Sequence, residues 1–101
     1  MLEGGYMPTL KRVETQIFRR EGFRVQFRDR QTGRDVRDNL EGITSYPYAK
    51  MARNRWSVNH WKDQRFNQCY PGFDVAVLRN DRHVAHGRTL LATVRDTYLA
   101  E

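Results

Sequence analysis

Two short stretches in which large apolar residues alternate with polar ones constrain the fold of this chain most. One lies near residue 25 and the other near residue 75, and both are rich in β-branched and aromatic side chains. Alternation with a period of two is typical of strands that bury one face. We expect both strands in one antiparallel sheet, whose inward face includes Phe23, Val25, Phe27, Val75 and Val77.

The stretch before the first of these strands has two interpretations. Val13, Thr15 and Ile17 alternate with polar residues and predict another strand within 9–20, whereas Leu10, Val13 and Ile17 also match a helical stripe. We favour the strand, as the first of a meander, and the helix stays open as the alternative.

A hairpin is predicted next along the chain. Segment 29–33 ends in Gly33, which can adopt the left-handed conformation that a short hairpin loop needs. A short strand at 34–37 would then return beside the alternating stretch. Together with 9–20, these elements predict a three-stranded antiparallel meander.

The middle of the chain has the signals of helices. Residues 43–47 offer a capping hydroxyl followed by Pro47 in the first turn, and no Gly or Pro occurs between Pro47 and Gln68. The apolar positions of this stretch do not form one continuous stripe. We therefore predict two shorter helices with a break near 56–59, ended by the breaker sequence 70–72.

The last third of the chain predicts a second hairpin and a final helix. A turn at Asn80 and Asp81 would lead into a short return strand at 83–86, and Thr89 is a candidate N-cap for a helix over 89–99. We expect this helix to be amphipathic and to cover the sheet. Its apolar stripe would consist of Leu90, Leu91, Val94, Tyr98 and Leu99.

The order of these elements predicts the fold class. Strands grouped with strands favour an α+β domain over a wound parallel sheet. We expect a small antiparallel sheet, built from a hairpin or three-stranded meander plus a second hairpin. One or two central helices and a C-terminal amphipathic helix would cover it.

The length of 101 residues suits one domain. We expect residues 1–8, which include two glycines and a proline, to be a flexible leader, and 9–101 to be a single basic domain. No apolar run approaches the ~18 residues of a membrane span. The lone cysteine, Cys69, fits a reducing compartment, so we expect a cytoplasmic protein.

Charge is the main indication of function. The chain has 18 Lys and Arg against 12 Asp and Glu, a formal net charge of +6, and 15 of the 18 cations are arginine. Arginine presents a planar fork of donors that grips phosphate or carboxylate with two hydrogen bonds. An arginine-rich small domain suits a polyanionic partner, and nucleic acid is the commonest one. GC-rich coding or solubility would also explain this composition.

One segment combines cations with aromatic rings. Residues 42–62 contain Lys50, Arg53, Arg55 and Lys62 and no acid, and Trp56 lies among them. Cations neutralise phosphates and rings stack on unpaired bases, so this pattern favours a nucleic-acid surface. The competing interpretation makes the rings core residues and the cations their solvent-facing neighbours.

A second basic row lies on the predicted hairpin. Arg24 and Arg28 share the face opposite the apolar side chains, and Arg30 lies in the following loop. Because a two-stranded ribbon can enter the major groove, this row is a competing docking surface. A solvated strand face that resists edge-to-edge aggregation is the alternative.

Metal and catalytic sites have little support. His83 and His86 would point to opposite faces of a strand, and Cys69 has no second cysteine to complete a zinc set. No phosphate-binding glycine loop, nucleophile elbow or metalloprotease motif occurs. A small nuclease could combine one of the three histidines with Arg88 and Tyr98, but the spacing selects none of them. We assign no catalytic residue, metal or cofactor.

Two hypotheses follow. The first is a non-catalytic module that binds DNA or RNA through Lys50, Arg53, Arg55, Trp56 and Lys62, with Arg24, Arg28 and Arg30 as further contacts. The second is a protein-interaction module, such as a homodimer or an inhibitor of a host factor, whose basic face meets an acidic protein. Size and charge are typical of small bacterial or mobile-element proteins, without a motif that names a family.

Overall fold

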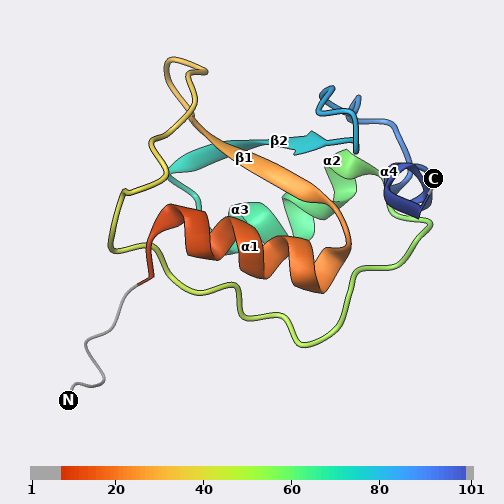
Figure 1. The fold of residues 1–101 in the computed structure, drawn as a ribbon, viewed down its shortest axis with the longest axis horizontal. Helices are drawn as coiled ribbons and strands as arrows, with labels where there is room; N and C mark the ends of the chain where they lie inside the picture. Colours follow the sequence, from red (N-terminus) through yellow and green to blue (C-terminus); the bar gives the residue numbers. More distant parts are fainter. Residues whose placement is uncertain (1–7, 100–101) are drawn as a thin grey trace.

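The two alternating stretches form a pair of antiparallel strands in the computed structural model, which describes residues 8–99 (Figure 1). Strand β1 spans Arg24–Asp29 and β2 spans Phe73–Leu78, with Val25 opposite Val77. The predicted inward residues are at most 5% exposed. The expected α+β class, the antiparallel pairing and the inward face of the two strands are therefore confirmed.

Residues 9–20, for which we favoured a strand, form a helix instead. Helix α1 spans Leu10–Glu21. The side-chain oxygen of Thr9 accepts a hydrogen bond from the backbone N–H of Arg12, and Gly22 ends the helix with a left-handed φ of 84°. The capping residue, the terminating glycine and the helical stripe thus determine the structure of this segment, rather than its local alternation. The stripe is fully buried and consists of Leu10, Val13 and Ile17.

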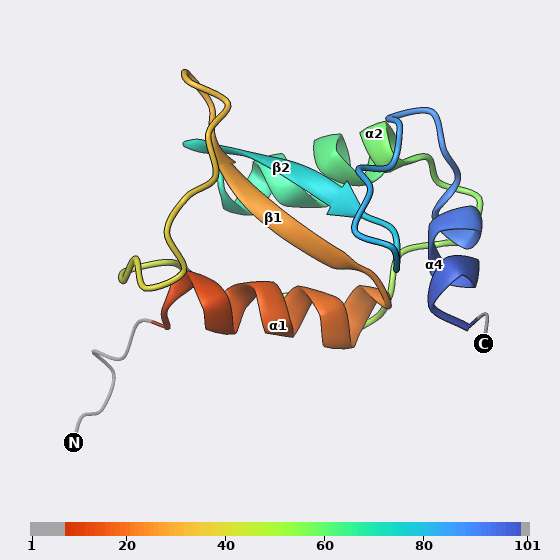
Figure 2. The same ribbon diagram turned by 45° about the horizontal axis from the view of Figure 1, so that its top comes forward.

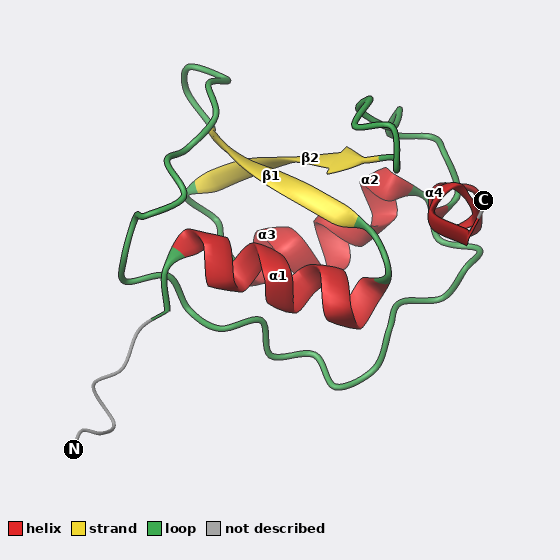
Figure 3. Cartoon of the chain, in the orientation of Figure 1, coloured by secondary structure: helices red, strands yellow, loops and turns green. Residues whose placement is uncertain are grey.

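The central helical segment is shorter than predicted and uninterrupted. It comprises α2 (Val58–Trp61), the π-helical turn η1 (Lys62–Phe66) and α3 (Asn67–Cys69). Ser57 caps its first turn by accepting from the N–H of His60. The predicted helix start at 43–47 is wrong, because Figure 3 shows this stretch as part of one long loop between β1 and α2.

Aromatic contacts join this helical segment to the sheet. The rings of Phe23 and Trp61 meet edge to face with centroids 5.2 Å apart, and Phe27 and Phe66 do so at 5.0 Å. Helix α1 lies alongside β1, as Figure 2 shows from a second angle. The core therefore lies between the strand pair and these helices.

The sheet has fewer strands than expected within the described residues. The predicted strand at 34–37 is reduced to one bridge between Arg28 and Asp35, and the predicted return strand at 83–86 to one bridge between Leu78 and Val84. The three-stranded meander and the second hairpin are therefore wrong as extended strands, because each returning segment pairs at a single position.

Helix α4 spans Leu91–Leu99, but its buried side differs from the predicted apolar stripe. Leu91 and Val94 are buried as expected. Leu90 and Leu99 are 46% and 75% exposed, whereas Arg95 is buried. The amphipathic character predicted for this helix is not confirmed, since two leucines of the predicted stripe are exposed and the charged Arg95 is buried.

A tyrosine connects α4 to the end of the strand pair. The hydroxyl of Tyr98 donates to the carbonyl of Leu78 at 2.5 Å and accepts from the N–H of Arg24 at 2.9 Å. The hydroxyl thus bridges the last backbone groups of the ladder. Of the predicted leader 1–8, all but Pro8 lies outside the described residues. Among residues 8–99, no helix has the length and apolar character needed to cross a membrane.

Candidate nucleic-acid interface

Half of the circumference of α1 is exposed and basic. At about 100° per residue, the positions on this side follow one another as 11, 15, 19, 12, 16 and 20. Four of them are cations and two are neutral polar residues. The four cations, Lys11, Arg12, Arg19 and Arg20, are exposed and form no ion pair with any residue in 8–99.

The two acids of α1 both turn inward. Glu14 is half-buried, and its carboxylate accepts a hydrogen bond from the backbone N–H of Phe27 at 2.9 Å. Burial raises the pKa of Glu14 to about 7, against the opposing effect of that hydrogen bond, and the negative charges of Asp38 and Asp35 raise it further. Glu21 is completely buried. The outer side of the helix therefore has no carboxylate of its own.

Glu21 is the centre of a buried network. Its Oε2 accepts from the hydroxyl of Tyr46 and from Arg65, both at 2.6 Å. Its Oε1 accepts from the backbone N–H of Ala52 at 2.8 Å and from Arg95 at 3.0 Å. Burial raises the pKa of Tyr46, and the hydrogen bond to Glu21 adds to this, so its hydroxyl stays a donor. Among the described residues no buried side-chain polar atom lacks a partner.

This network holds the long loop against the end of α1. Ala52 is bound to Glu21, and the backbone N–H of Tyr46 donates to the side chain of Gln16 at 2.9 Å. The loop therefore passes along α1 with Lys50 and Arg53 on either side of the anchored Ala52. Lys50, Arg53 and Arg55 are exposed and form no ion pair within 8–99.

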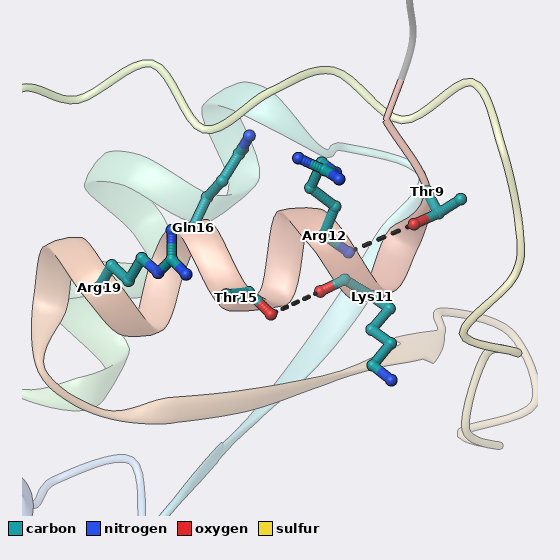
Figure 4. Close-up of a pocket in the computed structure, with 6 residues that line it drawn as sticks. All are labelled: Thr9, Lys11, Arg12, Thr15, Gln16 and Arg19. Atoms are coloured by element: carbon teal, nitrogen blue, oxygen red, sulfur yellow. Dashed lines mark hydrogen bonds between the residues drawn. The ribbon is translucent and has the colours of Figure 1, made fainter.

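Two surface hollows lie along α1, and the second of them reaches the loop. One, of about 380 Å³, is lined by residues from Thr9 to Arg19 on α1 (Figure 4). In that view Arg12 and Gln16 extend toward the neighbouring loop, while Lys11 points to the other side of the helix. The second hollow, of about 260 Å³, shares Gln16 and Arg19 and adds Arg20 with two tyrosines of the loop. The hollows make one continuous surface.

We call this surface the basic face. It combines the outward cations of α1 with the cations of the adjacent loop. It carries no exposed acid on α1 or on residues 49–57. Asp38 lies at one end, since it lines a hollow of about 320 Å³ together with Lys11. The basic face consists of Lys11, Arg12, Arg19, Arg20, Lys50 and Arg53, whereas Arg55 lines a separate hollow with Trp56 and His60.

The other residues predicted for the 42–62 segment are partly enclosed. Trp56 is half-buried, with its ring edge-on to that of His60 at 4.6 Å between centroids and the guanidinium of Arg65 5.7 Å from its centre. Lys62 is half-buried, and its Nζ lies 4.0 Å from a carboxylate oxygen of Asp74. Neither side chain belongs to the basic face.

The hairpin arginines contact other parts of the chain. The guanidinium of Arg24 lies 4.3 Å from the centre of the Phe18 ring, and Arg28 forms an ion pair with Asp35 at 3.2 Å. Arg30 donates to the side chain of Asn67 and to the carbonyl of Phe73. These three side chains remain predicted contacts with nucleic acid, although each of them already interacts with another residue of the domain.

The cations of α1 were missed because their segment was assigned to a strand. The signal that could have found them is the helical stripe of Leu10, Val13 and Ile17, since Glu14 and Glu21 fall on the same side as this stripe. Once the stripe is placed inward, the four cations must face outward.

The predicted absence of a metal site remains a prediction. No group of three or more His, Cys, Asp or Glu side chains suited to a metal occurs among residues 8–99. His83 lies 3.1 Å from a carboxylate oxygen of Asp81. In comparisons with known proteins, no family model matches this chain, and no curated protein and no solved structure matches it significantly.

Proposed function

We propose that this protein binds nucleic acid through the basic face and that this binding does not depend on catalysis. The observation that carries the proposal is the separation of charge on α1, whose cations face outward while Glu21 is buried and Glu14 is half-buried against β1. Apart from Asp38 and Glu14, which line a hollow with Lys11 at one end, such a surface presents its cations to phosphates without an adjacent carboxylate. Arginine adds paired donors that match phosphate oxygens.

The loop cations support the same proposal from a second element. Ala52 is fixed by Glu21, so Lys50 and Arg53 are presented beside the end of α1. Preorganised cations lose less conformational freedom on binding than those of a mobile segment. Each phosphate that is neutralised releases condensed counterions, so affinity should fall steeply as salt is raised.

The first prediction tests the two loop cations of this face together with the neighbouring Arg55. The triple substitution Lys50→Ala, Arg53→Ala, Arg55→Ala should weaken binding to short DNA and RNA probes, measured by fluorescence anisotropy at several salt concentrations. The slope of log affinity against log salt should flatten by about 0.7–0.9 for each phosphate that is no longer neutralised. The stability of the fold should hardly change, because all three side chains are exposed.

A matched control removes the same charge elsewhere. Arg34, Arg79 and Arg88 are exposed and lie outside the basic face, so their triple alanine variant should bind nearly as the parent does. The proposal is wrong if the parent binds no nucleic acid at low salt, or if the two triple variants lose affinity equally. In that case a complex with an acidic protein that survives high salt would support the protein-interaction hypothesis.

A further inference from the structure

The aromatic rings of this domain offer little for stacking on bases. Among residues 8–99 every Phe, Tyr and Trp side chain is buried or half-buried. The guanidinium of Arg65 lies 4.4 Å from the centre of the Tyr48 ring, and that of Arg24 lies over Phe18. Proteins that bind single strands without sequence preference use exposed rings as platforms for successive bases. On the basic face the rings of Tyr46 and Tyr48 line a hollow, but neither is fully exposed.

The cations of α1 are arranged as two pairs. Lys11 and Arg12 begin the helix and Arg19 and Arg20 end it. The two members of each pair point about 100° apart around the axis, and corresponding members are eight residues apart along it. At 1.5 Å per residue this separation is about 12 Å along the axis. The major groove of B-form DNA is also about 12 Å wide and has a phosphate strand on each side. The spacing of the pairs therefore matches the distance between the two strands.

The exposed residues between the two pairs are uncharged. Thr15 is neutral, and its hydroxyl donates to the carbonyl of Lys11 within the helix. Gln16 accepts from the backbone of Tyr46 and so holds the loop in place. The middle of the exposed side thus places no charge between the two pairs.

We propose that α1 bridges the major groove of double-stranded DNA, with one basic pair on each phosphate strand and no stacking on bases. This inference rests on the proposed function and names its ligand. Duplex RNA fits less well, because the major groove of an A-form helix is deep and narrow and RNA duplexes are read across the minor groove.

The two ends of the helix differ in charge. Asp38 lies near Lys11, whereas the Arg19–Arg20 end adjoins the loop that carries Lys50 and Arg53. The DNA strand bound at the Arg19–Arg20 end of α1 therefore lies near more cations than the other DNA strand does. We expect the double substitution Arg19→Ala, Arg20→Ala to weaken duplex binding more than Lys11→Ala, Arg12→Ala does.

The experiment compares three probes of one sequence with the parent protein at a single low salt concentration. They are a DNA duplex of about 16 base pairs, which is roughly one and a half turns, its single strand, and the RNA duplex. We expect the DNA duplex to bind at least about tenfold more tightly than the single strand, which has no second strand for the second pair to contact. In a separate titration of the duplex at several salt concentrations, each double variant of α1 should flatten the slope of log affinity against log salt by about 2.

A relocation variant separates spacing from total charge. Arg12→Thr combined with Thr15→Arg keeps the net charge and moves one cation a turn closer to the second pair. We expect a several-fold loss of duplex affinity with unchanged thermal unfolding. Unchanged affinity would overturn the bridging geometry.

The remaining outcomes distinguish the two proposals. A single strand bound as tightly as the DNA duplex would overturn this inference and leave the proposed function standing. An RNA duplex bound as tightly as the DNA duplex would overturn the assignment to the major groove. Failure of all three probes to bind would overturn the proposed function itself.

Discussion

The inner side of α1 holds a carboxylate at two places, and the surroundings of the two differ. Glu21 lies at the end of the helix, where four donors from three other segments meet its oxygens. Glu14 lies in the middle, beside β1, where a single backbone N–H reaches it and two further carboxylates act on it from nearby. One helix thus has one carboxylate with many hydrogen-bond donors around it and another with a single donor.

The difference shows what a buried charge can do for a small domain. A charge taken out of water costs free energy unless hydrogen bonds and opposite charges compensate it. Around Glu21 the compensation comes from the loop, η1 and α4, so the carboxylate joins three elements at one point. Around Glu14 the compensation is incomplete, and its pKa rises instead.

The largest expected loss of stability comes from replacing Glu21, the carboxylate with four donors. Glu21→Gln keeps the shape of the side chain but leaves Arg65 and Arg95 without a negative partner. Both guanidiniums are mostly enclosed, at 15% and 9% exposure of the side chain. We expect unfolding in urea to show a loss of about 3–5 kcal/mol. A loss below about 1 kcal/mol would mean that the network does not hold the elements together.

A smaller change tests one bond of that network. Tyr46→Phe removes the hydroxyl that donates to Glu21 and also accepts from the indole N–H of Trp61 at 3.2 Å. Hydrogen bonds to charged groups contribute about 1.5–3 kcal/mol, so we expect a loss in that range. Thermal and urea unfolding of the variant measure it. An effect equal to that of Glu21→Gln would contradict the division of the network into separate bonds.

The smallest expected effect comes from Glu14, whose substitution should raise the free energy of unfolding rather than lower it. The pKa of Glu14 is about 7 in the folded protein and about 4.3 in an unfolded chain, so the folded state binds the proton more tightly. The stability that protonated Glu14 contributes is therefore complete below about pH 4 and is lost as the pH rises toward 7. Glu14→Gln cannot titrate and should escape this loss.

The measurement is the free energy of unfolding of the parent and of Glu14→Gln at several pH values from 5 to 8. We expect the variant to gain about 1 kcal/mol relative to the parent over this range, because Glu14 is only half-buried and solvent screens its charge. Gln can still accept from Phe27. Two parallel curves would show that Glu14 has an ordinary environment, and the contrast with Glu21 would then disappear.

The parts of the fold that were predicted depend on local patterns. The strand pair followed from alternation at Val25 and Phe27 and at their partners, because those side chains meet one core. Helix α1 was missed, although its cap Thr9 and its stop Gly22 are both visible in the sequence. The helix start at 43–47 was predicted from local chemistry, but the N–H of Tyr46 is bound by a side chain thirty positions earlier. No local pattern reveals such a partner.

The candidate site was predicted in the same uneven way. The exposure of Lys50, Arg53 and Arg55 could be predicted, because an acid-free run of cations has to face water. The position of Lys50 and Arg53 beside the end of α1 could not, because it depends on a buried carboxylate that accepts from a backbone N–H 31 residues along the chain. Glu21 itself resembled any surface acid in the sequence. Only its four partners distinguish it.

Helix α4 makes the longest connections in the domain, and this has a consequence for the time course of folding. Tyr98 bonds Arg24 and Arg95 bonds Glu21, in each case across 74 positions. Closing so long a loop loses conformational entropy before the contacts that offset this loss can form. Domains dominated by distant contacts therefore fold slowly. A nascent chain that has not yet produced α4 leaves the strand ladder open at one end and Glu21 short of a counter-charge. We therefore expect one late and cooperative step, in which the last helix docks and both distant ends close together.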